Sequence, residues 1–296
     1  MPNRATKQSK LNVLRATQLK FPWLVHGFST RLGGFSRTYR DNALNLGFTK
    51  EDSQSAVERN RAAFLRELGE GSERGKAHSH PWSLVTLHQV HSDLIRFVDS
   101  PPETQLVGDG LITATSGLLL GIQTADCLPI LLADPKRRAV GMFHAGWRGT
   151  VKRIVEKGVG EMRRCFGSRA RDLKAAIGPG IHGCCYEVGG EVRGQFESQF
   201  AYAAKLFREV AESDPVREKY PMLFLTARPP GHSGLPKRIF LDLVEANRQQ
   251  LLAVGVPAKS IEASPLCTHC RTDLLFSYRA EKGRTGRMMG VVGIRA

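Results

Sequence analysis

The chain has 296 residues, of which 41% are hydrophobic and 24% are charged, and this composition excludes disorder for the body of the chain. The length allows one large domain or two modest ones with a sizeable core. The formal net charge of +15 favours anionic partners. Because no zinc-finger spacing, RNA-recognition signature or sustained basic run accompanies this charge, we do not expect a nucleic-acid partner.

No targeting or membrane segment is predicted. Residues 1–20 form a basic, polar lead-in without the apolar stretch of a signal peptide. The longest apolar region, 117–134, contains Gln123, Asp126 and Pro129 and is therefore a poor membrane helix. Six cysteines in a chain of this length do not indicate a disulfide framework. We therefore expect a cytoplasmic protein whose cysteines are thiols, ligands or nucleophiles.

The first half of the chain predicts a helix followed by a series of strands. The helix covers 53–69, with a serine at its start and a glycine at its end. Short apolar runs bounded by Gly, Pro, Asp or Ser then predict strands at 83–90, 94–99, 110–115, 118–125 and 139–145. A second helix follows over 149–165.

The second half predicts a strand at 173–180, helices over 190–212 and 240–255, and a closing strand pair at 274–281 and 287–294. Residues 213–236 are rich in Pro, Gly and charge, which predicts a surface insertion. Strands come in runs with helices between them, so we expect an α+β fold. The lead-in 1–20 then precedes a single domain over 21–296.

Reactive side chains lie at the ends of three of the predicted strands. "LHQVHSD" supplies His88 and His91, "TADC" supplies Cys127, and "FHAGWRG" supplies His144. Two imidazoles and a thiolate suit Zn²⁺ or copper, and three protein ligands leave a fourth position open, as in catalytic zinc sites. Their spacing requires the fold to bring distant strand ends together. A buried thiol with two hydrogen-bonded histidines is the alternative.

Polar residues beside this group point to an anionic ligand. Asp126 would be costly inside an apolar strand unless it is paired or reaches a polar site. Arg148 lies in "AGWRG" and Arg31 in "STRLGG", and an arginine beside glycine turns suits phosphate or carboxylate. Two further patterns are weak. "GPGIHG" matches the glycine pattern of a dinucleotide-binding loop, but no helix pattern follows it. "CTHC" at 267–270 lacks a second pair of cysteines at the distance found in zinc ribbons.

Seven segments together resemble the polyphenol oxidase or laccase-domain family, which is also described as peptidoglycan editing factors and purine nucleoside phosphorylases. They cover about residues 25–294 in the family's order: "HGFSTRLGG", "QVHSD", "GDGLIT", "TADCLPILLAD", "GMFHAGWRGT", "IGPGI…CYEVG" and "FSYRAEKGRTGR". The chain departs from the family pattern in the second cysteine of "CTHC", the doubled cysteine of "GCCYEVG" and the basic segment 213–236. These departures affect the expected substrate more than the expected metal site.

The resemblance implies a single YfiH-like domain, with mixed sheets packed between helices, and a zinc site made of His91, Cys127 and His144. Copper is the alternative metal. The implied reaction is phosphorolysis of adenosine, inosine or methylthioadenosine, and some family members also deaminate adenosine. Arg31 and Arg148 are then the predicted phosphate ligands, and Asp126 a predicted proton relay. The expected partners are a purine nucleoside and phosphate, in a monomer or a dimer and without a membrane.

Three other functions stay open at this point. Cys127 with a histidine base would suit a cysteine hydrolase or amidase acting on muropeptide precursors. A basic RNA- or nucleotide-binding protein without catalysis would suit the net charge. A copper-dependent polyphenol oxidase is the weakest alternative, because the sequence has few clustered histidines.

Overall fold

The computed structural model describes residues 11–70, 82–211, 219, 222 and 237–295 of the chain. By their contacts, the residues divide into two compact units, Met1–Ile181 with Leu243–Ala296, and His182–Asp242. Most of the predicted insertion at 213–236 and the first half of the predicted lead-in lie outside the described residues. The domain boundaries predicted from the sequence stay a prediction.

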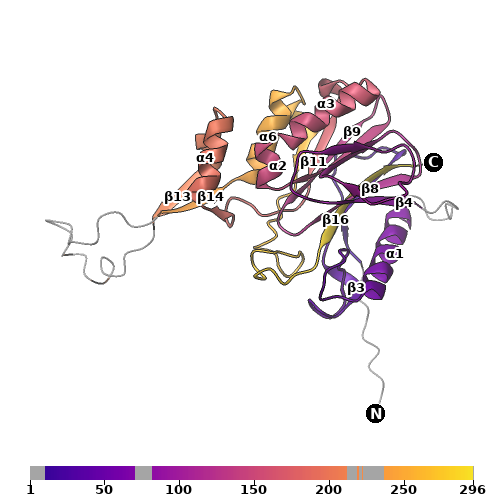
Figure 1. Cartoon of the computed structure of the whole chain (residues 1–296), viewed down its shortest axis with the longest axis horizontal. Helices are drawn as coiled ribbons and strands as arrows, with labels where there is room; N and C mark the ends of the chain where they lie inside the picture. The colour runs from indigo at the N-terminus through magenta and orange to yellow at the C-terminus, as the bar shows by residue number, and fades with distance from the viewer. Residues whose placement is uncertain (1–10, 71–81, 212–218, 220–221, 223–236, 296) are drawn as a thin grey trace, which may run out of the picture. The chain divides into compact units, whose positions relative to one another are not determined.

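Two six-stranded mixed sheets form the centre of the first unit (Figure 1). The first sheet has the order β1 (Val13–Leu14), β2 (Leu24–Ser29), β16 (Met288–Ile294), β8 (Leu118–Thr124), β4 (Ser83–His88) and β6 (Leu106–Val107). The second has the order β15 (Ile261–Ala263), β11 (Lys174–Ile177), β9 (Leu128–Asp134), β10 (Ala139–Ala145), β7 (Gly110–Thr113) and β5 (Ile95–Phe97).

The two sheets pack face to face, and helices cover their outer faces. Strands β9 and β10 contact β8 and β16 across the interface. Helix α1 (Gln54–Glu70) packs on β2 and on the separate strand β3 (Leu32–Ser36), whereas α3 (Ile154–Phe166) packs on β10 and β7 of the other sheet. Two more helices, α2 (Trp147–Val151) and α6 (Leu243–Ala253), pack with α3. The α+β prediction of mixed sheets between helices is therefore confirmed.

The main hydrophobic core lies between the sheets. Leu120 and Val292 of the first sheet and Leu131 and Met142 of the second belong to one buried cluster. The strands that face this core carry apolar residues with hardly any exposed surface, which explains their near-continuous hydrophobic sequences. Ala16 also joins this cluster, so the described end of the predicted lead-in packs on the core.

The described residues of the second unit form a three-stranded antiparallel sheet and a helix. The sheet has the order β12 (Glu187–Val188), β14 (Lys237–Leu241) and β13 (Phe207–Ala211). The helix is α4 (Gly190–Gln199). The rings of Phe196, Phe200 and Phe207 pack against one another with centroids 5.7 and 5.8 Å apart. Short 3₁₀ turns complete the described fold at Ala170–Asp172, Ala203–Leu206 and Ala258–Ser260.

Several predicted elements differ from the structure. The helix predicted over 190–212 ends at Gln199, and its last residues form the edge strand β13, whose pairing with β14 overrides helical spacing. The predicted strand at 274–281 consists of turns. Its backbone bonds are mostly local, as from the Leu275 amide to the Arg271 carbonyl and from the Glu281 amide to the Ser277 carbonyl, and none pairs it with a strand. The helix predicted over 149–165 is split between α2 and α3, where Arg153 has a left-handed φ of 64°.

The packing of α3 on β10 gives a testable contrast between two glycines of the same helix. A Cβ at Gly158 would lie 2.6 Å from the Phe143 ring, whereas a Cβ at Gly160 would meet nothing within 4 Å. We expect Gly158→Ala to lower the free energy of unfolding by about 1–3 kcal/mol through overpacking. Gly160→Ala should raise it by about 0.5–1 kcal/mol, because alanine is the better helix former.

Urea unfolding monitored by circular dichroism measures both effects. Changes of the same sign in the two variants would contradict the packing of α3 on Phe143.

Candidate metal centre

The β9–β10 hairpin brings Cys127 and His144 together. In this antiparallel pair, Leu128 lies opposite Ala145, and Pro129 lies opposite His144. Cys127 therefore precedes the first paired residue of β9, beside the point where β10 ends. The 17-residue gap between the two residues is the length of the hairpin. The predicted position of Cys127 after the end of β8 is also correct, because the chain crosses from one sheet to the other at Asp126 and Cys127.

Asp109 fixes the imidazole of His144. It immediately precedes β7, which pairs with β10, and its backbone carbonyl accepts a hydrogen bond of 2.7 Å from the His144 amide. The Asp109 carboxylate is completely buried, and its Oδ1 lies 2.7 Å from His144 Nδ1. Because Nδ1 bonds to the carboxylate, Nε2 of His144 is the ring atom left to act as a ligand.

The same carboxylate holds the loop that carries His91. Asp109 accepts hydrogen bonds from the backbone amides of Val90, His91 and Ser92, at 3.3, 3.1 and 2.6 Å. It also accepts one from the Ser92 hydroxyl at 2.7 Å. These bonds hold His91 in a left-handed conformation with φ 56°, which is uncommon for a residue other than glycine. One buried acid therefore positions both histidines.

The three donor side chains fit a single metal ion. The ligand atoms of His91, Cys127 and His144 all lie within 4.8 Å of one another, and Cys127 Sγ is 4.0 Å from His91 Nε2. A tetrahedral zinc ion would bring such atoms to about 3.5 Å, so small side-chain movements suffice. The donor group therefore suits zinc or copper chemically, as the sequence predicted.

The backbone leaves room for these donors only because residue 146 is glycine. A Cβ at Gly146 would lie 2.8 Å from Cys127 Sγ and 3.3 Å from a carbon of the His91 ring. The glycine starts α2 in an extended conformation. His91 is exposed, whereas His144 is buried. The donor group is therefore open to solvent where His91 lies. An open coordination position is typical of catalytic rather than structural zinc.

Without a metal, Cys127 and His144 form a coupled acid–base pair. Burial alone would raise the pKa of the Cys127 thiol, but His144 and His91 outweigh it and lower that pKa to about 6. Burial alone would lower the pKa of His144, but Cys127 and Asp109 raise it to about 9. Burial also opposes ionisation of Asp109, yet the bonds from His144 and Ser92 hold its pKa below the usual range. Near neutral pH the pair is a thiolate and an imidazolium.

Asp126, the predicted proton relay, is tied to the C-terminal part of the chain. Its Oδ1 accepts a 2.6 Å hydrogen bond from the Thr268 hydroxyl, and its Oδ2 accepts one of 2.7 Å from the Arg279 amide. The side chain is buried, and its φ of 93° is strained for a residue other than glycine. These contacts favour a positioning role beside Cys127. The relay stays a prediction.

The two arginines predicted to bind phosphate have different surroundings. Arg148 lies on α2, four residues after His144, and is exposed. Arg31 is buried, with its guanidinium bonded to the carbonyl oxygens of Thr272 and Tyr39 and paired with Glu281 at 3.0 Å. These contacts favour a structural role for Arg31 in holding the segment 272–281. Its role as a phosphate ligand stays a prediction.

Two residues of the centre were not singled out from the sequence. Asp109 lies in "GDGLIT", where the glycines and the following apolar run indicated only a turn and a strand. Thr268 lies in "CTHC", a pattern that is defined by its two cysteines and gives no role to the residue after the first of them. His88, which chemistry alone left equivalent to His91, is the exposed last residue of β4 and is outside the donor group.

The comparisons with known proteins agree with the motifs. A family model described as multi-copper polyphenol oxidoreductase laccase matches residues 25–295, and the chain belongs to this family. The chain is 36% identical to the purine nucleoside phosphorylase of Deinococcus radiodurans, over 96% of this chain and 93% of that protein. It is 34% identical to adenosine deaminase RL5 from an unknown prokaryotic organism, over 89% and 91%.

A solved structure shares the fold. The crystal structure of YlmD from Geobacillus stearothermophilus matches with a TM-score of 0.73 and 32% identity, over 95% of this chain and 94% of that one. Among the residues described here, no helix is long and apolar enough to cross a membrane. The family predicted from the sequence motifs is therefore confirmed.

The Asp109 carboxylate gives a prediction for metal affinity. Asp109→Asn keeps the shape of the side chain but removes the charge that orients His144. We expect zinc to bind about 10–100-fold more weakly, as when a carboxylate behind a histidine ligand is lost. Competition with a chromophoric chelator measures this. Ser92→Ala removes one of the hydrogen bonds to Asp109 and should lose less. Equal affinities for the wild-type chain and Asp109→Asn would contradict the orienting role.

The Cys127–His144 pair gives a prediction for thiol reactivity. In the metal-free protein, alkylation of Cys127 by iodoacetamide should rise as the pH rises through about 6, because the thiolate is the nucleophile. Peptide mass spectrometry follows Cys127 separately from the other thiols. His144→Ala should shift the rise to higher pH, and bound zinc should suppress it. A midpoint near 8.5, the ordinary cysteine value, in the unsubstituted chain would contradict the coupling.

Proposed function

We propose that the chain is a zinc-dependent purine nucleoside phosphorylase that also deaminates adenosine. Its substrates would be adenosine, inosine or methylthioadenosine with phosphate, and its products a free base and a ribose 1-phosphate. The observation that carries the proposal is the open group of His91, Cys127 and His144 held by Asp109. The names of the relatives supply the reaction class.

His91, Cys127 and His144 would hold the zinc ion. A zinc ion with an open position supplies Lewis acidity to a bound oxygen or nitrogen. Zinc is proposed over copper because a donor set of one thiolate and two imidazoles is common at zinc sites with an open position. A multicopper centre needs many more histidines. Among the described residues, only two histidines, His91 and His144, belong to a group that could hold a metal.

In phosphorolysis, the bond between the purine nitrogen and C1′ of the ribose breaks and a bond from a phosphate oxygen to C1′ forms. The leaving purine takes the bonding electron pair and a proton. Arg148 is the proposed phosphate ligand, because it is exposed on α2 directly after the β10 end that carries His144. The base would lie on the apolar surface next to His91, where Val90 is 44% exposed.

Deamination of adenosine would use the same site without phosphate. Water would replace the amino group at C6 of the purine, releasing ammonia and leaving inosine. The protons could pass through the polar groups around Cys127, and Asp126 is the relay that the sequence predicts. The hydrogen bonds that occupy both oxygens of Asp126 make a supporting role the stronger proposal.

A cysteine hydrolase acting on muropeptide precursors is the second candidate function. The coupled Cys127–His144 pair favours it, because a thiolate beside an imidazolium held by a buried acid is also the arrangement of a nucleophilic cysteine. Such a hydrolase would need no metal. The six thiols and the absence of a membrane-spanning helix in the described residues suit the cytoplasm as the proposed location of either enzyme.

The test of the proposal is an adenosine assay with and without phosphate, on purified chain of known zinc content. We expect adenine only when phosphate is present, and inosine in either condition. Cys127→Ala should abolish both products, whereas Cys165→Ala, on α3 outside the donor groups, should keep them. Undiminished activity of the metal-free chain, or hydrolysis of an amide substrate without zinc, would favour the cysteine hydrolase.

Arg148 is tested by the dependence on phosphate concentration. Arg148→Ala should raise the KM for phosphate by about 10–100-fold, since a charged hydrogen bond contributes about 1.5–3 kcal/mol. Arg163→Ala, an exposed arginine of α3, is the matched control and should leave that KM unchanged. An unchanged phosphate KM in Arg148→Ala would remove Arg148 from the phosphate site.

A further inference from the structure

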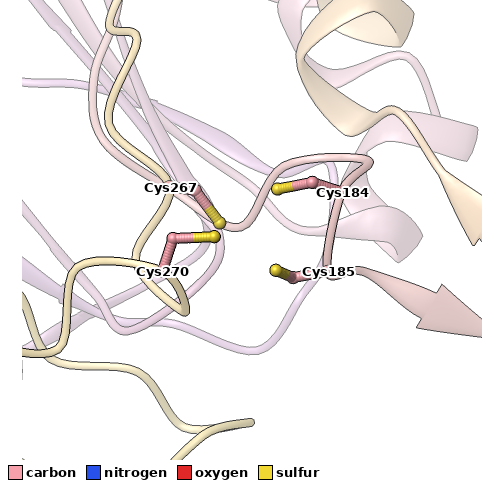
Figure 2. Close-up of side chains that lie close together, drawn as sticks. All are labelled: Cys184, Cys185, Cys267 and Cys270. Atoms are coloured by element: carbon pink, nitrogen blue, oxygen red, sulfur yellow. The ribbon is translucent and has the colours of Figure 1, made fainter.

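Four cysteines that are far apart in the sequence form a second donor cluster, separate from the first. They are Cys184 and Cys185 of "GCCYEVG" and Cys267 and Cys270 of "CTHC". Their sulfur atoms all lie within 4.8 Å of one another. Figure 2 shows the four side chains pointing into one space, two from each segment. None of them belongs to the group of His91, Cys127 and His144.

The local backbone explains why these segments meet. Gly180 forms a β-bridge with Cys267, and the Thr268 amide donates a 3.0 Å hydrogen bond to the Gly180 carbonyl. Cys184 follows Gly180 by only four residues, which at about 3.3–3.6 Å per residue keeps it close to that bridge. This backbone pairing brings the chain just before Cys184 beside the segment that carries Cys267 and Cys270.

Two turns direct both members of each pair to one side. Adjacent residues of a strand point to opposite faces, but the amides of Cys185 and Tyr186 both donate to the His182 carbonyl at 2.9 Å and close a turn. The Arg271 amide donates to the Cys267 carbonyl at 3.0 Å and closes the turn of "CTHC". A C-x-x-C turn of this kind is a common half of a zinc site.

We propose that Cys184, Cys185, Cys267 and Cys270 bind a structural zinc ion. All six cysteines of the chain are described, and each is a thiol rather than half of a disulfide. Four thiolates around one point favour zinc or iron over harder cations. Tetrahedral zinc requires neighbouring sulfur atoms about 3.8 Å apart, which a small contraction of the cluster provides. Four protein ligands leave no open position, so this ion would not take part in catalysis.

The proposed ion would stabilise the first metal centre indirectly. Thr268 lies between the two cysteines of "CTHC" and is completely buried, with its hydroxyl bonded to Asp126 at 2.6 Å. The Asp126 carbonyl also accepts a 2.7 Å hydrogen bond from the Ile181 amide, just before the other cysteine pair. Asp126 precedes Cys127. A zinc ion that fixes both turns would therefore fix the backbone that presents Cys127.

The experiment measures the zinc content of the purified full-length chain by mass spectrometry. The Cys127→Ala variant serves as the background, because it lacks a ligand of the first centre. The wild-type chain should hold about two zinc ions, and Cys127→Ala should retain about one. Adding Cys184→Ser and Cys270→Ser to Cys127→Ala should remove the remaining ion. Adding Cys165→Ser instead, at the end of α3 and outside both clusters, should leave it. The thermal midpoint should fall only in the variants that lose this ion.

Three results would overturn the proposal. One is an equal zinc content in the Cys184→Ser/Cys270→Ser and Cys165→Ser variants. Another is a disulfide among the four thiols, seen as two missing hydrogens in the mass of the alkylated, unreduced protein. The third is stoichiometric iron in place of zinc. If the double variant is insoluble, Cys127→Ala grown with cobalt decides: an absorption spectrum of Co²⁺ bound by four thiolates supports the site, and a spectrum without thiolate charge transfer overturns it.

Discussion

The carboxylate of Asp109 is the interaction on which the first metal centre depends. It is completely buried and accepts hydrogen bonds from His144, from the Ser92 hydroxyl and from three consecutive amides of the His91 loop. A buried charge without such partners would cost several kcal/mol. The β7–β10 pairing places Asp109 beside His144, so strand pairing determines that the carboxylate lies next to this imidazole. Removal of the charge would weaken both the bond to the His144 imidazole and the bonds that hold the His91 loop.

Asp126 positions Cys127, as Asp109 positions the two histidines. It does so by anchoring the backbone just before Cys127 to the C-terminal segment. Its carboxylate joins Thr268 and the Arg279 amide, which lie more than 140 residues away in the sequence. Arg31 also holds this segment, through Thr272 and Glu281. Residues that the family pattern places at a site can therefore serve to shape it. Their burial and hydrogen bonds favour this shaping role, and the proton relay by Asp126 and the phosphate contact of Arg31 stay predictions.

Much of the fold and of the donor group could be predicted from the sequence, for physical reasons. The strands facing the core carry continuous apolar runs. His144 lies near the end of one strand, and His91 and Cys127 follow the ends of two others. Asp109 could not be recognised in this way, because its role depends on strand pairing rather than on neighbouring residues. The sequence of β13 predicts a helix, because only the pairing with β14 reveals that its side chains alternate with a period of two. The four cysteines were missed as a group because a β-bridge at Gly180, not spacing, brings them together.

Anomalous diffraction at the zinc absorption edge, from crystals of the purified chain, shows directly whether these residues hold a metal. We expect a peak within bonding distance of Cys127 Sγ and of the Nε2 atoms of His91 and His144, with a ligand position open to solvent. Asp109 should remain bonded to Nδ1 of His144. A fully ordered centre without a peak, in protein that releases adenine from adenosine and phosphate, would contradict the central claim that catalysis depends on a metal held by these residues.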